Sequence, residues 1–149
     1  VRKRLLPESG SVSQIAMCAM DNWGGEIGET GTSALVIIEG LTMYLSEADV
    51  KRIFAVISGR FDRVTVLVET MNPMVVRRFR EKSIEASRAK FRWGVKDGAA
   101  LAALLPDFRL VEEHSLCEGM AEFAPVYRLL DKIPAVRNIS NRIVVLEKK

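Results

Sequence analysis

The sequence predicts a single α/β domain, built on a mostly parallel sheet with an antiparallel final strand. Short runs of β-branched residues alternate with helical patterns along the chain, as expected for strand–helix units. The 149 residues are enough for one compact core and too few for two ordinary domains. The last two strand candidates come late and are joined by an irregular link, which indicates an antiparallel, hairpin-like end to the sheet.

Composition and charge exclude several classes of protein. Hydrophobic residues make up 48% of the chain and charged residues 28%, which is typical of a globular protein. The net charge is only +3 and the basic residues are scattered, so no nucleic-acid partner is expected. No apolar run approaches the roughly 20 residues that span a bilayer, so no membrane partner is expected either. The basic start is followed by Pro7 rather than by an apolar stretch, unlike a signal peptide.

The few cysteine and histidine residues do not have the number or spacing of a disulfide framework or a zinc site, so no metal is expected. Cys18 and Cys117 lie far apart, and the chain has one histidine. We therefore expect a cytoplasmic, reducing setting. The chain opens with Val1, inside a helical pattern, which hints at a missing amino-terminal part; tag removal or processing explains the absent methionine equally well.

Three apolar runs are candidates for the first strands. The run 15–20 is short and predicts a buried strand, and a turn-rich stretch follows it. The run 34–38 predicts a strand that is buried on both faces. The run 64–68 is the third candidate.

The helix between the second and third runs has clear boundary signals. Ser46 and Asp49 have the spacing of a capping box, Leu45 and Val50 that of a hydrophobic staple, and Gly59 can end the helix. One helical face then carries Val50, Ile53, Phe54 and Ile57.

The second half of the chain carries two further capping signals. Asn72 and Pro73 can cap and begin a helix that carries Val76, Phe79 and Arg80. Further along, a short helix is predicted from the cap Asp97 through Leu104, stopped by Pro106, and the last two strand candidates are 108–113 and 142–147.

The most informative feature is an acid and a glycine, Glu39 and Gly40, directly after the second apolar run. This is the carboxyl end of a predicted strand, where open α/β sheets bind ligands. A carboxylate is costly there unless it meets water or a positive partner. The spacing alone leaves two alternatives open, a ligand-binding acid and a loop cap.

The stretch Glu39-Gly40-Leu41-x-Met43-Tyr44-Leu45, followed by Ser46-Glu47-Ala48-Asp49-Val50, resembles a segment of one methyltransferase family. That family holds the leucine carboxyl methyltransferases and the tetracenomycin-type polyketide O-methyltransferases, and the segment follows their fourth strand. Supporting similarities extend over almost the whole chain, at Arg4 to Pro7, Ala16 to Trp23 and Phe91 to Val95.

The resemblance implies a Rossmann-like fold and S-adenosyl-L-methionine as the cofactor. Cys18 and Ala19, before Asp21, match the place where the family meets the adenine amino group. Cys18 stands where serine or aspartate is usual, so a hydrogen bond there would be weaker or come from the backbone. Glu39, beside Gly40, matches the acid next to the methionine moiety, whose sulfonium and ammonium groups suit a carboxylate.

On the acceptor side, the resemblance suggests Tyr44 as a substrate-binding candidate. Further candidates are Glu69, which ends its predicted strand as Glu39 does, and Arg92 and Trp93. Tyr44 is at least as often a core residue in such a run, and loop packing explains Arg92 and Trp93 equally well. His114 closes a predicted strand and titrates near neutrality. With no acid partner at a telling distance, it is expected to be a surface or edge residue, and no catalytic residue is assigned.

Two elements of the family are absent from the sequence: the glycine-rich turn after the first strand and the acid on the second strand. The glycines of 24–31 have the wrong pattern for that turn and predict a flexible loop. We therefore expect residues 1–149 to form a partial methyltransferase domain, an incomplete and inactive portion of the enzyme.

The function expected from this resemblance is S-adenosylmethionine-dependent O-methylation of a small molecule of polyketide type, at a hydroxyl or a carboxylate. An alternative acceptor is the carboxylate of a protein carboxyl-terminal leucine. A second hypothesis is a non-enzymatic remnant or degenerate binding module, which can self-associate through an exposed sheet edge. A third hypothesis is another nucleotide-binding α/β protein, such as half of a dehydrogenase, and only fold-level analogy supports it.

Overall fold

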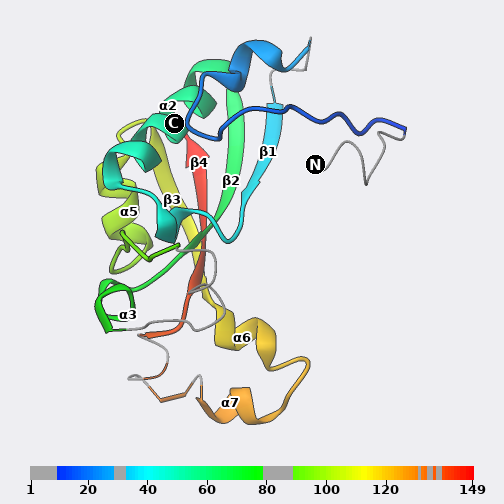
Figure 1. Ribbon diagram of the computed structural model, residues 1–149. Helices are drawn as coiled ribbons and strands as arrows, with labels where there is room; N and C mark the ends of the chain where they lie inside the picture. Colours follow the sequence, from blue (N-terminus) through cyan, green and yellow to red (C-terminus); the bar gives the residue numbers. More distant parts are fainter. Residues whose placement is uncertain (1–9, 29–32, 79–88, 131, 134–135, 137–138) are drawn as a thin grey trace.

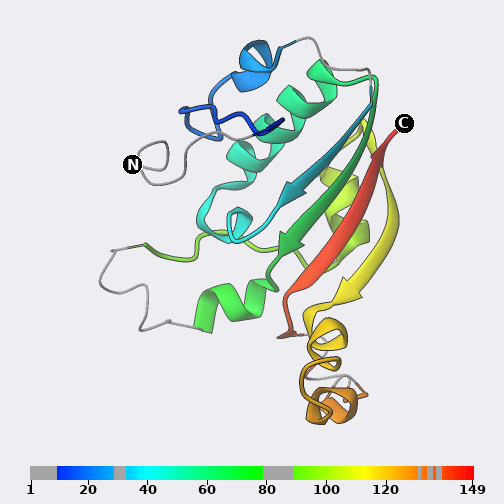
Figure 2. The ribbon, with the colours of Figure 1, turned by 90° about the vertical axis from the view of Figure 1, so that its right-hand side faces the viewer.

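The computed structural model describes residues 10–28, 33–78, 89–130, 132–133, 136 and 139–149. Figures 1 and 2 show one twisted sheet with helices packed on one side of it. The spatial order of the strands is β1-β2-β4-β3. Their bounds are Ser33–Ile38 for β1, Arg63–Thr70 for β2, Phe108–Ser115 for β3 and Arg142–Lys148 for β4.

The sheet is mixed, and only the pairing of β1 with β2 is parallel. β4 pairs antiparallel with both β2 and β3, so the expected antiparallel final strand is present. The expectation of a mostly parallel sheet is wrong for the strand pairings. The reason is that β4 lies between β2 and β3, where it separates two strands that run in the same direction.

The helix α2, Glu47–Arg60, forms as its sequence signals predict. The Ser46 hydroxyl accepts from the Asp49 amide at 3.2 Å, and the Asp49 carboxylate accepts from the Ser46 amide at 2.9 Å. The helix runs one residue past Gly59. The predicted apolar face is buried, and it consists of Val50, Ile53, Phe54 and Ile57.

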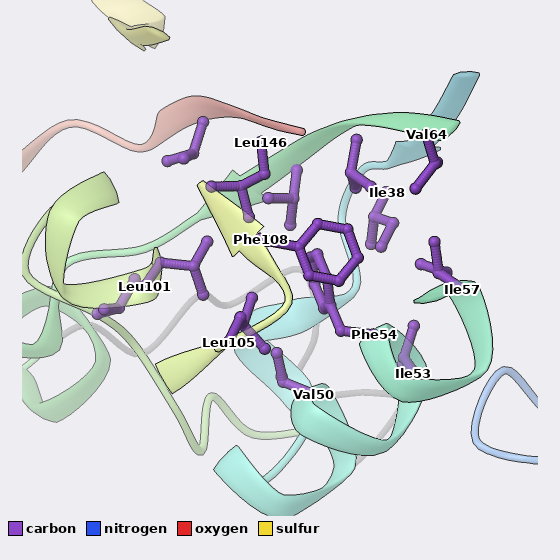
Figure 3. Packing of buried hydrophobic residues seen from close by; sticks show 14 of the residues in the cluster. Ile38, Val50, Ile53, Phe54, Ile57, Val64, Leu101, Leu105, Phe108 and Leu146 are labelled. Atoms are coloured by element: carbon purple, nitrogen blue, oxygen red, sulfur yellow. The ribbon is translucent and has the colours of Figure 1, made fainter. Parts of the chain in front are cut away.

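The hydrophobic core lies between the sheet and two helices, α2 and α5 (Gly98–Leu104), on the same side of the sheet (Figure 1). Figure 3 shows Phe54 of α2 and Phe108 of β3 facing each other in this layer, and their rings meet edge to face at 5.1 Å. Asp97 caps α5 as predicted, since its carboxylate accepts from the Ala100 amide at 2.8 Å.

The opposite face of β1 lies open within the described part of the chain. Leu35 is 63% exposed and Ile37 66% exposed, so the prediction of burial on both faces is wrong. All the described helices that pack against the sheet lie on its other face. The prediction of a strand at 15–20 is also wrong, because Ile15 and Met17 are exposed and none of the strands in the described part of the chain pairs with this segment.

The glycine-containing stretch is more ordered than predicted. Residues Trp23–Glu26 form a 3-10 helix, η1, against α2, so the expectation of a flexible loop is wrong there. The Arg60 side chain of α2 donates to the carbonyls of Ile27, at 3.1 Å, and Gly28, at 2.8 Å. The rest of the stretch, residues 29–32, lies outside the described residues, as does the 4–7 segment of the resemblance.

The remaining short helices follow β2 and β3. α3, Pro73–Arg78, has the predicted cap, because the Asn72 side chain accepts from the Met74 amide at 2.8 Å. Phe79 and Arg80 lie outside the described residues. Two short helices, α6 (Leu116–Met120) and α7 (Val126–Leu130), lie in the link between β3 and β4, beyond the end of the sheet (Figure 2). Each helix in the described ranges is too short or too polar to cross a membrane.

His114 lies near the end of β3, the edge strand farthest from β1 in the sheet order. No acid partner is evident from the sequence pattern, but the structure provides two. Its Nε2 atom lies 3.1 Å from the Glu112 carboxylate, and its Nδ1 atom lies 3.3 Å from the Glu118 carboxylate. These two hydrogen bonds, Glu112 first and Glu118 second, raise the pKa of His114 above its ordinary value of 6.5.

We predict that stability depends on pH through His114. A pKa raised by folding means that the contribution is fully present below pH 6.5 and disappears as the pH rises through the folded pKa. Because the chain has one histidine, its ring protons can be titrated by NMR without overlap. We expect Glu112→Gln to lower this pKa more than Glu118→Gln does. An unshifted pKa in both variants would contradict the contacts.

Gly94 sets a second prediction about the fold. A Cβ atom at Gly94 would lie 2.5 Å from the Met71 carbonyl oxygen and 2.8 Å from Val76 Cγ2. Gly94→Ala should therefore lower the free energy of unfolding by about 1–3 kcal/mol, measured by urea denaturation. The control is Gly25→Ala, where no atom lies within 4 Å and little change is expected. An equal loss in both variants would show that close packing is not the cause.

Candidate functional site

The parallel pairing of β1 and β2 brings two acids to the same edge of the sheet. Ile38 pairs with Val68, so Glu39 and Glu69 are the residues that follow this last pair. The Gly40 amide donates to the Glu69 carboxylate at 2.9 Å, and the Thr42 hydroxyl donates to the Glu69 carbonyl at 2.6 Å. The structure thus brings together three of the residues that the sequence singled out, Glu39, Gly40 and Glu69.

Gly40 forms the turn that follows β1. Its φ of +63° lies in the left-handed region, which favours glycine. A Cβ atom there would meet nothing within 4 Å, so conformation rather than space requires the glycine. The turn leads into the 3-10 helix η2, Thr42–Tyr44, and leaves Glu39 exposed at the strand end.

Glu39 lines a hollow of about 250 Å³ between β1, α2 and the 19–23 segment. Among the described residues, no donor contacts the Glu39 carboxylate. Most of the wall is apolar or aromatic, and one acid, Glu39, lies at its rim. Such a wall suits a ligand that combines an apolar portion with a positive group. The lining residues are Ala19, Trp23, Val36, Ile37, Ile38, Glu39, Leu41, Ile53 and Ile57.

The segment predicted to meet adenine forms a tight turn beside this hollow. The Asp21 carboxylate accepts from the Cys18 amide at 3.1 Å, and the Asp21 amide donates to the Cys18 carbonyl at 3.0 Å. The Trp23 indole donates to the Ala19 carbonyl at 3.1 Å. Asp21 therefore holds the turn in place, Ala19 lines the hollow, and the Cys18 thiol is free and exposed.

Two of the four acceptor-side candidates, Tyr44 and Arg92, lie together in a second place, where the 91–93 segment runs beside η2. The Arg92 amide donates to the Met43 carbonyl at 2.7 Å, and the Tyr44 and Phe91 rings lie 5.4 Å apart. Tyr44 and Arg92 line a hollow of about 450 Å³ with Ala89, Lys90 and Phe91. Trp93 is separate, because it is partly buried against the core.

Sequence reasoning missed two residues of this region. Trp23 belongs to the Ala16 to Trp23 similarity but was not singled out as a site residue, although it lines the hollow with Glu39. Asn141 donates to the Glu69 carboxylate at 2.7 Å from 72 residues away. No local pattern could have identified Asn141, because its partner is set by the pairing of β2 with β4.

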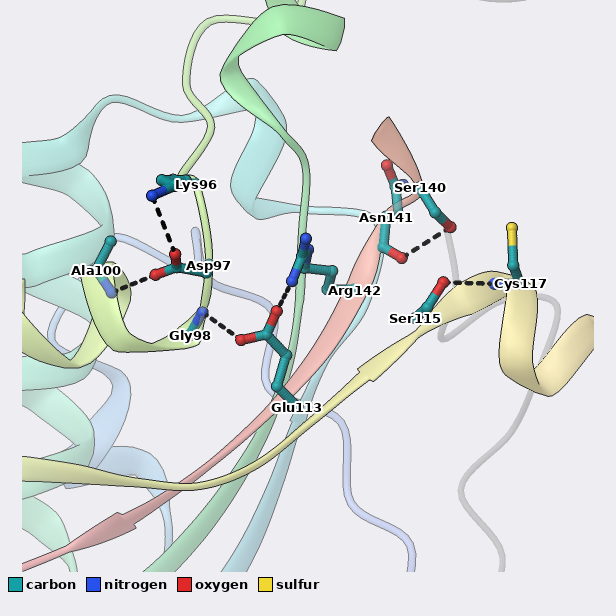
Figure 4. Close-up of polar contacts among 10 residues, drawn as sticks. All are labelled: Lys96, Asp97, Gly98, Ala100, Glu113, Ser115, Cys117, Ser140, Asn141 and Arg142. Atoms are coloured by element: carbon teal, nitrogen blue, oxygen red, sulfur yellow. Dashed lines mark hydrogen bonds and ion pairs between the residues drawn. The ribbon is translucent and has the colours of Figure 1, made fainter. Parts of the chain in front are cut away.

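The residues at the start of β4 connect this edge to the core helices. Figure 4 shows Arg142 paired with Glu113 of β3, next to Asn141. The same Glu113 carboxylate accepts from the Gly98 amide at 2.7 Å, at the first turn of α5. Both members of the ion pair are mostly buried, with side chains 18% and 19% exposed. The start of β4 is therefore fixed from both sides.

A larger hollow of about 680 Å³ lies between η1 and α2, and Arg52 and Arg60 are among its lining residues. Its wall contains no carboxylate and none of the residues that the sequence singled out for cofactor or acceptor binding. Over the described ranges, no group of three or more His, Cys, Asp or Glu side chains is placed to hold a metal ion. The hollow beside Glu39 is thus the better candidate site.

Comparison with known proteins shows similarity to a distant relative. The chain is 29% identical over 131 residues to the tetracenomycin polyketide synthesis O-methyltransferase TcmP of Streptomyces glaucescens. The match covers 85% of this chain and 48% of TcmP, so the chain spans about half the length of that relative. No family model and no solved structure matches the chain. The chain is thus distantly related to a methyltransferase, and its mixed four-stranded α/β sheet is compatible with that relationship.

Proposed function

We propose that this chain contributes part of the cofactor site of an S-adenosylmethionine-dependent O-methyltransferase with a Rossmann-like fold. The observation that carries the proposal is the hollow at the end of β1, where the Glu39 carboxylate, which no donor among the described residues contacts, lies beside apolar and aromatic walls. The distant similarity to TcmP supports the same assignment, since that relative is an O-methyltransferase.

The residues present fit the cofactor in part. The Glu39 carboxylate suits the ammonium and sulfonium charges of the methionine moiety, and Ala19 and Trp23 offer an apolar wall to the adenine. The hollow of about 250 Å³ is smaller than the roughly 300–1,000 Å³ of a typical ligand pocket. The described residues therefore supply one side of such a site, and binding by this side alone is expected to be weak.

When bound, S-adenosylmethionine supplies a methyl group that its sulfonium already activates. The tasks left to the protein are to orient the acceptor oxygen and to exclude water. Tyr44 and Arg92, which line the second hollow, are the proposed acceptor contacts. The guanidinium of Arg92 suits an acceptor carboxylate, because it can form two parallel hydrogen bonds with it. A small molecule with a hydroxyl or carboxylate, of polyketide type, is the proposed acceptor.

We predict that Glu39→Gln weakens the binding of S-adenosylmethionine to this chain by about two- to fivefold, because an exposed charge pair contributes roughly 1 kcal/mol or less. Equilibrium dialysis with labelled cofactor, at chain concentrations high enough for millimolar affinity, measures the change. The control is Glu122→Gln, which removes the same charge from an exposed position outside both hollows. Equal affinity of all three proteins would remove Glu39 from the site.

A second candidate function is a non-catalytic module of the same fold that binds through β1. The observation in its favour is the edge position of this strand, together with the exposure of Leu35 and Ile37 on its open face. An apolar edge strand offers both unpaired backbone groups and apolar contacts to another chain.

For this candidate we predict concentration-dependent self-association, measured by light scattering. The double variant Leu35→Thr, Ile37→Thr should reduce it, since threonine keeps the strand propensity and removes apolar surface. Phe123→Thr is the matched control, because Phe123 is 84% exposed but lies outside the sheet. A wild-type chain that stays monomeric at high concentration would exclude this candidate.

A further inference from the structure

Glu69 connects the ends of three strands, β1, β2 and β4. It lies near the end of β2, and its two carboxylate oxygens accept from different parts of the chain. One accepts from the Gly40 amide at 2.9 Å, in the turn after β1, and the other from the Asn141 side chain at 2.7 Å, just before β4. Its own carbonyl accepts from the Thr42 hydroxyl at 2.6 Å.

These contacts hold the turn at its left-handed residue, Gly40, and again two residues later, at Thr42. Gly40 adopts φ +63°, and no backbone carbonyl in the described structure accepts from its amide. The Glu69 carboxylate supplies the acceptor, and hydrogen bonds to an ionised acceptor are about twice as strong as neutral ones. The Thr42 contact fixes the next part of the turn to β2.

The two acids at this edge differ in their partners. Two donors satisfy Glu69, whereas no donor in the described part of the chain contacts Glu39. A carboxylate with both oxygens engaged is suited to hold neighbouring backbone in place, and an open one is suited to meet a ligand. Glu69 touches the turn that carries Glu39 and lines neither of the two hollows beside η2 and β1.

We infer that Glu69 is a positioning residue for the Glu39–Gly40 turn, and that Asn141 holds it in that role. For its functional part, this inference rests on the proposed cofactor site at Glu39. It assigns Glu69 a different role from the acceptor contact that its place at a strand end predicted. The segment that contains α6 and α7 is thereby linked to the turn, because Asn141 also accepts from the Leu116 amide at 2.8 Å through its carbonyl.

Hydrogen exchange of the Gly40 amide, measured by NMR, tests the positioning without any cofactor. Glu69→Ala removes the acceptor, so Gly40 exchange should become about tenfold faster or more. Asn141→Asp should also speed exchange, because two carboxylates then face each other. Adding Glu69→Gln to Asn141→Asp should restore slow exchange, since the glutamine can accept from Gly40 and donate to the new aspartate. This double variant also keeps the net charge of the wild type.

Thermal unfolding curves identify variants that remain folded, and Glu122→Gln is the charge control for Glu69→Ala. Unchanged Gly40 exchange in Asn141→Asp, or faster exchange that the double variant does not repair, would overturn the inference. Dialysis with labelled S-adenosylmethionine should then show weaker binding in Asn141→Asp and recovery in the double variant. Cofactor binding as tight as in the wild type, in a variant whose Gly40 amide exchanges faster, would also overturn the inference. A wild type that binds no cofactor refutes the proposed function instead, and the exchange results still decide the positioning role.

Discussion

The parallel pairing of β1 with β2 is the constraint on which the candidate site depends. Parallel strands end at the same edge, so the register that aligns Ile38 with Val68 also places Glu39 beside Glu69. The core holds this register, because Val66 and Val68 are fully buried beneath α2 and α5. A shift by one residue would turn these valines to the open face and would separate the two acids.

This arrangement gives two neighbouring carboxylates different tasks. Glu69 receives a backbone amide and a side-chain amide, so it stabilises the turn between β1 and η2. Glu39 receives no donor from the described residues and lies at the rim of a mostly apolar hollow. The two acids therefore differ electrostatically. Glu39 keeps its attraction for a cationic group, whereas both oxygens of Glu69 already accept hydrogen bonds. The left-handed conformation of Gly40 forms the turn in which the Gly40 amide contacts Glu69 while the preceding residue, Glu39, stays exposed.

Local signals in the sequence predicted several of the elements correctly, whereas the order of the strands depends on long-range pairing. The cap Ser46 with Asp49, the cap Asp97 and the strand at β2 follow from residues close in the chain. The position of β4 between β2 and β3 could not be predicted that way, and neither could the contact of Asn141 with Glu69. The apolar pattern of β1 indicated burial on two faces, whereas only one face is covered in the described part of the chain.

The two tryptophans test most directly the proposal that the end of β1 forms part of a cofactor site. Trp23 lines the hollow with Glu39, and Trp93 packs against the core outside it. In an NMR titration with S-adenosylmethionine, the indole signal of Trp23 and the amide signals of Ala19 and Gly40 should shift together, with one dissociation constant, while the Trp93 indole stays in place. Unmoved signals at Trp23 and Gly40, at cofactor concentrations of several millimolar, would contradict the account.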